Sequence, residues 1–256
     1  MLRRAFTLVE VLLVILLIGA IVFFSFPDFK AEFRRRSLME SADRLRALIV
    51  MCHAEAMREG RYYRIQMPRT PDPNDPNASK TVEVPLETEQ PQVIRQRDLL
   101  NPEDWEGFEA YWKDQPILQD GTRCIGVFPG RPNFDIQGNS PIAGPQIDGT
   151  ETTYVPVTFN PDGTCDWATF VLTDLPPDTE LQPSHVARIL NVILDGRTGQ
   201  VWIQRALRVE EVEVMQEHGA SPIFHMDFLV SEPITEENIL QIHIRQKGAV
   251  GSGGVR

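Results

Sequence analysis

The sequence predicts an α+β protein in which one long N-terminal helix, half transmembrane and half amphipathic, packs on an antiparallel β-sheet head. Three observations favour this fold. An apolar run of 21 residues extends from Phe6 to Phe26, an amphipathic pattern follows it to Glu59, and short strand-like runs separated by turn signals fill the second half of the chain. The 230 residues after the apolar run are enough for one ordinary domain.

The apolar run from Phe6 to Phe26 has the length of a transmembrane helix. At about 1.5 Å of rise per residue it extends for roughly 30 Å, which is the thickness of the hydrocarbon core of a bilayer. One charge interrupts it, the carboxylate of Glu10. An unpaired charge is costly in hydrocarbon and marks a function by default. We therefore expect Glu10 to have a cationic partner; the simpler alternative places it at the membrane interface, where its side chain reaches water.

The residues around the start of this run suggest a processing signal. Arg3 and Arg4 are followed by the small residue Ala5 and then by "FTLVE", which begins with Phe6 and contains Glu10. An ordinary secretory signal has a shorter apolar core and a small-residue cleavage site after it. The arrangement instead resembles the class III signal of type IV pilins and of the pseudopilins of type II secretion systems. It differs in one place: the residue before the cut is usually glycine in that family and is Ala5 here.

The resemblance implies how the N-terminus is used. A prepilin peptidase would cut between Ala5 and Phe6 and methylate the new amine, and Glu10 would pair with the N-terminal amine of the neighbouring subunit as a register device for assembly. Pro27 lies where many members of the family carry a helix-bending proline. The implied partners are other pseudopilins or pilins, the prepilin peptidase and an inner-membrane assembly platform. The implied location is the inner membrane, with a single span and the head in the periplasm.

Residues 27–60 carry the pattern of an amphipathic helix. Apolar residues recur in steps of three and four, with glutamates and arginines on the other face. These apolar positions are Phe33, Leu38, Ala42, Leu45, Leu48, Ile49, Cys52 and Ala56. Gly60 stands in the position of a C-terminal stop signal, with Arg58 in the last turn. A continuous helix from Phe6 to Glu59 would be about 80 Å long.

The end of this helix, "LRALIVMCHAEAMREGRYYRIQM", resembles a narrower group, the minor pseudopilins of the GspH and FimT type. In that group a leucine-rich helix ends in an alanine, glutamate, alanine run with a basic residue and a glycine, and a strand follows at once. The matching residues are Ala54, Glu55, Ala56, Arg58 and Gly60, whereas His53 replaces the usual arginine. The later stretch "NPDGT...ILNVILDGRTGQVWIQ" follows the ending of the same group.

The chain between residues 61 and 209 reads as a β-rich head of that type. Short β-branched or alternating runs are separated by turn signals such as "NPDG" and "DGRTG". They are "TRCIGVFP", "TYVPVTFNPDG", "WATFVLTD", "RILNVILD" and "QVWIQRAL". Residues 189–194 and 200–205 form the clearest hairpin, and with a strand over 62–67 we expect them to make the one sheet on which the helix packs. Arg46 is expected on the polar helix face, where substitutions change stability little.

Two further segments of the head have their own signals. "NPEDWEGFEAYWKD" is predicted to be a short helix, with Asn101 as its cap and Pro102 at its first position, and with Trp105, Phe108 and Trp112 on one face. "PRTPDPNDPNASK" is predicted to be a loop. Its acidic side chains offer oxygen atoms that calcium binds, but its prolines interrupt the regular spacing that a calcium-binding loop needs.

The C-terminal extension is less regular than the head. "FHMDFLV" is predicted to be a strand, "ITEENILQIHIRQK" fits helix and strand templates about equally, and the final "GAVGSGG" is predicted to be disordered. The expected division of the chain is a leader peptide (1–5), a transmembrane helix (6–26), an amphipathic helix of the stalk (27–60), a GspH-like β-rich head (61–209) and the extension with its tail (210–256).

Three cysteines, Cys52, Cys124 and Cys165, are too few for a disulfide scaffold. Two alternatives stay open. One is a bridge between Cys124 and Cys165, because Cys52 falls in a helical pattern. The other is three unbridged thiols, buried or partly exposed.

Composition and motifs narrow the function to a structural role. A net charge of −11 disfavours a nucleic-acid partner, and the basic cluster Arg34 to Arg36 is interpreted as a juxtamembrane anchor. The five histidines show no metal-ligand spacing, and no nucleophile elbow or phosphate loop is present. We therefore expect no enzyme activity, catalytic residue, metal or cofactor. The leading hypothesis is a minor pseudopilin subunit of a type II secretion pseudopilus or type IV pilus-like fibre; the alternative is a membrane-tethered binding or enzymatic head that uses a pilin-type anchor.

Overall fold

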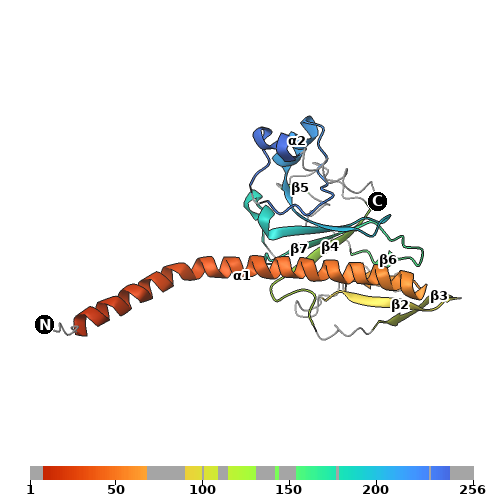
Figure 1. Cartoon of the computed structure of the whole chain (residues 1–256), viewed down its shortest axis with the longest axis horizontal. Helices are drawn as coiled ribbons and strands as arrows, with labels where there is room; N and C mark the ends of the chain where they lie inside the picture. The colour runs from red at the N-terminus through yellow and green to blue at the C-terminus, as the bar shows by residue number, and fades with distance from the viewer. Residues whose placement is uncertain are drawn as a thin grey trace, which may run out of the picture.

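The computed structural model of the chain describes residues 8–67, 90–99, 101–108, 115–130, 142–143, 154–176, 179–230 and 232–242. Its first element, α1 (Leu8–Glu59), is one continuous helix of 52 residues. The helix ends where the sequence predicts, because Gly60 adopts a φ of 66° and donates its N–H to the carbonyl of Ala56 at 3.0 Å. The N-terminal half of α1 projects away from the head, and its C-terminal half lies within the head (Figure 1).

The described residues of the head form two four-stranded sheets, and the strands within each sheet pair antiparallel. The first sheet has the order β3 (Asn101–Gly107), β2 (Gln92–Asp98), β1 (Tyr63–Gln66) and β6 (Val157–Phe159). The second has the order β4 (Arg123–Pro129), β7 (Ala168–Thr173), β8 (Ile189–Leu194) and β9 (Val201–Arg205). A small pair, β5 (Ile142–Ala143) with β10 (Leu207–Arg208), the 3₁₀ helix η2 (Pro183–Arg188) and α2 (Val209–Glu217) complete the named elements.

The two sheets pack on different sides of α1. The helix contacts β1 and β6 of the first sheet and β7, β8 and β9 of the second. In Figure 1 the strands β2 and β3 lie below the helix, and β4 and β7 lie above it. The residues of α1 that are buried between the sheets, here called the core stripe, are Leu38, Ala42, Leu45, Leu48, Ile49, Cys52 and Ala56. The predicted stripe is therefore confirmed from Leu38 onward, whereas Phe33 is 67% exposed.

The expectation of one sheet is wrong. The strand β1 pairs with β2 and β6, while β8 and β9 belong to the second sheet. Strand pairing is chosen by contacts distant in sequence, so alternation along a single segment does not reveal its neighbours. Two sheets also cover more of the helix circumference than one sheet can.

The predicted short helix at residues 101–114 is also corrected, as far as residue 107. These first residues form β3, in which Trp105 pairs with Gln96 of β2. The side chain of Asn101 does not cap a helix; it accepts a hydrogen bond from the N–H of Glu103 at 3.3 Å. Local helix signals are weak beside the hydrogen bonds of a sheet ladder, and here the pairing with β2 outweighs them. Trp112 lies outside the described residues.

The second sheet is buried on both faces. Every residue of β7 and β8 is buried, because α1 covers one face and a second apolar cluster covers the other. The extension begins with α2, which was not predicted and whose residues Val212 and Met215 belong to a third apolar cluster. The predicted strand "FHMDFLV" is not a strand; within it, Phe228 forms a single parallel bridge with Gln204. The segment "ITEENILQIHIRQK", which fitted helix and strand equally, is helical over 236–242.

A buried ion pair ties the extension to the second sheet. The guanidinium of Arg205 in β9 donates two hydrogen bonds to the carboxylate of Glu211 in α2, at 2.7 and 2.9 Å, and the two side chains are only 2% and 3% exposed. Arg205 also donates to the carbonyls of Val230, Ala206 and Glu232. Glu211 in turn accepts hydrogen bonds from the N–H groups of Arg208 and Ile234, each at 2.8 Å.

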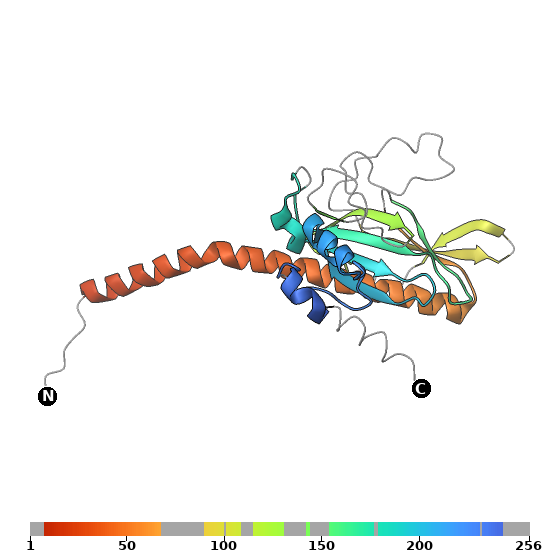
Figure 2. The ribbon, with the colours of Figure 1, turned by 90° about the horizontal axis from the view of Figure 1, so that it is seen from above.

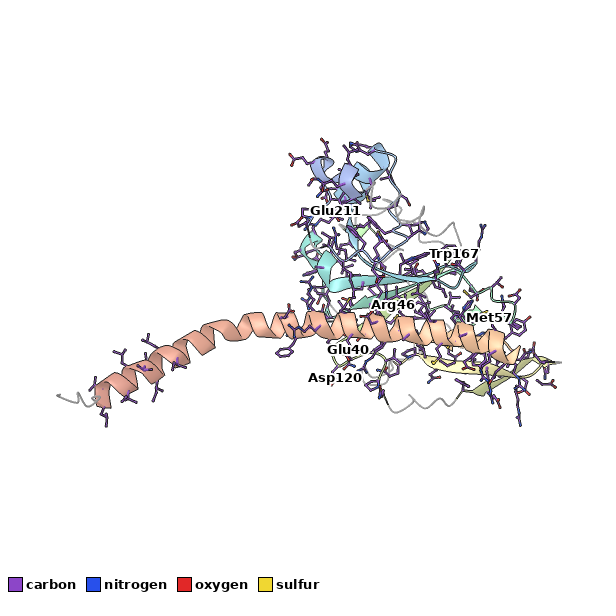
Figure 3. The ribbon with its side chains drawn as sticks, in the orientation of Figure 1. Glu40, Arg46, Met57, Asp120, Trp167 and Glu211 are labelled. Carbon is purple, nitrogen blue, oxygen red and sulfur yellow. The ribbon has the colours of Figure 1, made fainter. Side chains whose placement is uncertain are left out.

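Arg46 was predicted to be a solvated residue of the polar helix face. Its side chain is instead only 31% exposed and makes two ion pairs. It donates one hydrogen bond to Asp227 of the extension at 2.6 Å and another to Asp43 one turn earlier on α1. Asp227 also accepts a hydrogen bond from the N–H of Ile203 in β9 at 2.9 Å. Figure 3 shows Arg46 in the head half of α1 and Glu211 in the upper lobe of the molecule. The effect of substituting Arg46 on stability therefore stays a prediction.

The structure also bears on the predictions for the cysteines and the membrane span. Cys52, Cys124 and Cys165 are all free and buried, so the bridged alternative is wrong. The proline-rich loop and the glycine-rich tail lie outside the described residues. Within the described part of the chain, no helix combines the length and the hydropathy that a membrane span requires.

The core stripe predicts a sharp contrast between two neighbouring positions of α1. Leu48 is 3% exposed and Val50 is 50% exposed. The substitution Leu48→Asp removes a buried leucine, which commonly costs 2 to 5 kcal/mol, and adds the desolvation of a carboxylate. We expect it to unfold the head, whereas Val50→Asp should change the free energy of unfolding by only about 0.5 kcal/mol. Circular dichroism and urea titration of the two full-length variants measure this, and equal damage would mean that the buried face is wrongly assigned.

The buried ion pair predicts a large effect at Glu211 and a small one at its exposed neighbour Glu210. Glu211→Gln leaves the charge of Arg205 buried without its partner and should lower the free energy of unfolding by about 3 to 5 kcal/mol. Glu210→Gln should change it by only about 0.5 kcal/mol. Denaturant titration compares them. A small loss for Glu211→Gln would show that the pair contributes little to stability.

The same pair predicts how stability depends on pH. Burial alone would raise the pKa of Glu211, but the hydrogen bonds from Arg205, Arg208 and Ile234 outweigh burial and hold its pKa below the usual carboxyl range. The stability contributed by Glu211 is therefore fully present above the ordinary carboxyl pKa and is lost as the pH falls through the lowered value. Urea titrations at several acidic pH values measure the free energies of unfolding of the parent chain and of Glu211→Gln. The two free energies should become equal only at the lowest pH. A constant difference at every pH would contradict this.

Candidate functional site

The N-terminal part of α1 is apolar around its whole circumference and is exposed. Ten apolar residues between positions 8 and 18 each have between 47% and 78% of their surface exposed. They are Leu8, Val9, Val11, Leu12, Leu13, Val14, Ile15, Leu16, Leu17 and Ile18. Successive residues of a helix point about 100° apart, so this run has no polar face apart from position 10. A helix that is apolar all round is stable only inside a membrane or against other apolar surfaces.

A short charged neck separates this apolar segment from the head. Residues 32–36, here called the neck, are all exposed, and within the neck Arg36 donates to Glu32 at 3.1 Å. The head begins directly after it, where the hydroxyl of Ser37 donates to the carbonyl of Asp120 at 3.4 Å. The hydroxyl of Ser41 accepts a hydrogen bond from the N–H of Gln119 at 2.9 Å, and Leu38 is 1% exposed. Leu8 thus lies about 42 Å along the helix from Arg36, and the side chains that the structure describes in between, at 9, 11–18 and 32–35, are exposed.

Figure 2 shows the same separation from a second direction. The N-terminal half of α1 extends from one end of the head, and no strand lies beside it in either view. The basic cluster Arg34 to Arg36, which was predicted to be a juxtamembrane anchor, lies in the neck with exposed side chains. Its position suits contact with a surface next to the head, because its guanidinium groups are available to solvent.

Of the predicted site residues, the structure describes only the backbone of Glu10. The backbone of Glu10 belongs to the first turn of α1, and its side chain lies outside the described part of the structure. Ala5 and Phe6, the predicted cleavage and methylation residues, also lie outside the described residues. The pairing of Glu10 with an N-terminal amine therefore stays a prediction.

His53 packs α1 against neighbouring parts of the head. His53 shares a hydrogen bond of 2.8 Å with the carbonyl of Gly163, and its ring lies against the edge of Phe159. The ring of His53 also occupies the space in which a side chain at Gly199 would lie, and Gly199 has a φ of 68°. Position 53 thus packs α1 against two turns. Among the described residues, no group of histidines, cysteines and carboxylates is arranged to hold a metal ion.

The thiols of the head are poorly suited to chemistry. Burial raises the pKa of Cys52 far above its usual value, with a smaller contribution from Glu55. Burial, together with the nearby Asp166 and Asp195, raises the pKa of Cys165 to about 12. A thiol that stays protonated is a weak nucleophile and a poor metal ligand. These cysteines therefore act as small apolar residues of the core.

Sequence reasoning missed two arginine arrangements. Arg205 occupies an inward position of β9 in register with Val201 and Ile203, and an arginine in such an alternation signals a buried charge that needs a partner. The second arrangement places Arg64 over the ring of Trp105 on the first sheet. No sequence signal links these two residues, because their contact depends on the pairing of β2 with both β1 and β3.

The apolar N-terminal segment of α1 is therefore the best-defined candidate site in the described structure, and its exposed side chains between positions 8 and 18 are aliphatic. Comparisons with protein-family models, with curated proteins and with solved structures found no match to this chain.

Proposed function

We propose that this chain is a pilin-like minor pseudopilin that a prepilin peptidase processes between Ala5 and Phe6. The mature subunit is held in the inner membrane by the N-terminal half of α1, with its head in the periplasm. It then joins a type II secretion pseudopilus or a type IV pilus-like fibre through the same helix. Its partners are other pseudopilins or pilins, the peptidase and an inner-membrane assembly platform.

The observation that carries the proposal is the exposed apolar circumference of residues 8–18. A surface of this kind in water would drive aggregation, so it requires a second apolar environment. A bilayer supplies that environment before assembly, and a bundle of equivalent helices supplies it afterwards. A subunit that moves from one to the other needs a helix that is apolar on every side, as this one is.

The separation of the two halves of α1 supports the same proposal. The core stripe commits the C-terminal half to the head, while the apolar side chains described between positions 8 and 18 are exposed. An insertion helix must be free to enter another structure without unfolding its own domain. The distance of about 42 Å along the helix from Leu8 to Arg36 suits this, because it exceeds the roughly 30 Å of a bilayer core.

The processing signal supplies the chemical reason for Glu10. Cleavage before Phe6 creates an amine one helical turn from Glu10, and the two opposite charges compensate each other in a medium without water. A pair between neighbouring subunits would also fix their relative register, which is the best-attested use of a buried charge. The carboxylate therefore acts in assembly and not in the stability of the head.

The first prediction of this proposal concerns the mature N-terminus. Mass spectrometry of the protein purified from membranes should find Phe6 as the first residue, carrying a methyl group on its amine. Replacing Ala5 with a bulky residue should block the cut. A mature chain that retains Met1 to Ala5 would favour the plain membrane-tethered head over an assembling subunit.

A second prediction separates assembly from folding at Glu10. Glu10 lies about 42 Å along the helix from Leu38, the first residue of the core stripe. The substitution Glu10→Ala should therefore leave the thermal midpoint of the head unchanged while copurification with partner pseudopilins falls. Glu40→Ala, at an exposed position that pairs with Arg44, serves as a control that should keep copurification. Undiminished incorporation of Glu10→Ala would argue against charge pairing.

A further inference from the structure

Phe33 is a large apolar side chain that the head does not cover. The amphipathic pattern predicts it on the buried face of α1, yet it is 67% exposed, the largest exposed fraction among the aromatic side chains that the structure describes. Its neighbours Glu32 and Arg34 are exposed charged residues of the neck. An aromatic ring among solvated charges leaves a large apolar area in water, so a partner that covers the ring would lower the free energy.

A cavity opens beside α1 directly after the neck, and it is here called the neck cavity. Its volume is about 160 Å³, and it lies between α1, η2, the second sheet and the extension, at the end of the head from which the N-terminal half of α1 emerges (Figure 2). Its apolar lining consists of Leu38, Met39, Ala187, Leu190 and Leu229. Leu38 and Leu190 are buried, whereas the other three are half-buried, so the cavity is open to solvent. An apolar cavity of about 150 Å³ is large enough to take up a benzene ring.

Two arginines complete the lining of the neck cavity, and they suit an aromatic occupant. The N–H groups of Arg205 are all engaged by Glu211 and by backbone carbonyls, so Arg205 needs no hydrogen-bonding ligand. Arg35 is exposed and forms no ion pair within the described part of the chain. A guanidinium attracts the face of an aromatic ring. The neck cavity therefore favours an aromatic side chain over a polar ligand.

Phe33 and the neck cavity lie on opposite sides of α1. Successive residues of an α-helix are turned by about 100°, so Arg35, Leu38 and Met39 point about 200°, 140° and 240° away from Phe33. The ring of Phe33 therefore cannot enter the cavity of its own chain, but it can enter the cavity of a second copy that lies alongside. A contact between two different surfaces of one chain leaves a ring at one end and a cavity at the other, so it can repeat into an open fibre.

One axial offset between copies serves both this contact and the N-termini. Under the proposed function, the amine of Phe6 in one copy pairs with Glu10 of its neighbour, which shifts the two helices by four residues, about 6 Å. With that shift, Phe33 of the first copy lies level with Ser37 of the neighbour, in the middle of the α1 residues that line the neck cavity. The ring and the cavity thus meet in the register that the terminal charges would set.

We propose that Phe33 of one copy of this chain inserts into the neck cavity of a second copy, with the guanidinium of Arg35 against the face of its ring. Repetition of the contact joins the copies head to tail. The inference rests on the proposed assembly through α1, and it adds a contact between neighbouring subunits outside the apolar segment. It also gives a reason for an exposed phenylalanine in a charged neck.

Resonance energy transfer between copies in lipid vesicles tests this contact. The full chain, purified from membranes, is labelled with a donor or an acceptor dye at a cysteine added after Arg256; the three native cysteines are buried, so the dye reacts with the added one. We expect energy transfer that falls on dilution with lipid, and Phe33→Ala should weaken the association about tenfold. Val50→Ala removes another exposed apolar side chain of α1, outside the neck cavity, and should leave the association unchanged.

Filling the neck cavity should have the same effect as removing the ring. Ala187→Leu should weaken the association about tenfold; Leu229→Phe fills the cavity from another wall and replaces it if its thermal midpoint shows that Ala187→Leu does not fold. A mixture then tests the direction of the contact. Copies with the filled cavity still carry the ring of Phe33, and Phe33→Ala copies still carry an open cavity, so energy transfer between the two variants should recover.

Three results would overturn the proposal. The first is a parent chain that does not associate with itself, and the second is a Phe33→Ala variant that associates like the parent chain, as expected if the ring only contacts lipid headgroups. The third is a mixture of the folded variants that associates no better than either variant alone. Processing before Phe6 and copurification with partner pseudopilins are measured separately, so failure here leaves the assembly proposal standing.

Discussion

The apolar stripe of α1 from Leu38 to Ala56 is the constraint on which the whole head depends. An isolated amphipathic helix is marginal in water, and most of its stability comes from covering its apolar face. Here two sheets cover that face from different sides, so the helix serves as the core of both. Burial of one leucine contributes roughly 1.5 to 3 kcal/mol, and the stripe contains three leucines and one isoleucine. Neither sheet would keep its inner face dry without the helix.

Ionic contacts attach the extension to this core. The pair of Arg205 with Glu211 is fully buried and completely hydrogen-bonded, and the contact of Arg46 with Asp227 joins the extension directly to α1. Exposed pairs on the same helix, such as Arg36 with Glu32, contribute little, because water and salt screen them. These contacts therefore tie the extension to β9 through Arg205 and to α1 through Arg46.

Much of this fold could be predicted from the sequence because its signals are local. The stripe from Leu38 to Ala56, the stop at Gly60 and the hairpin of β8 with β9 each depend on periodicity or turn residues within one segment. The division into two sheets could not be predicted, since it depends on which distant strands pair. The same holds for the contact of Arg46 with Asp227, which joins residues 181 positions apart.

The failures at β3 and at Arg64 have the same physical origin. The segment beginning at Asn101 has helix signals, yet pairing with β2 makes it a strand, and only that pairing brings Trp105 next to Arg64. The candidate assembly surface was easier to find, because an apolar run is visible in the sequence without any knowledge of its neighbours. The structure adds that the described part of this run, residues 8–18, is exposed on every side and lies beyond the neck.

We propose that one helix has two kinds of partner, its own head for the C-terminal half and other molecules for the N-terminal half. The most direct test places a photo-crosslinking amino acid at Leu13 of the full chain, which is 56% exposed, and identifies the crosslinked products in intact membranes by mass spectrometry. The account predicts adducts with lipid or with other pilin-like subunits, and none with residues 38–242 of the same chain. Crosslinks from Leu13 to its own head would contradict it.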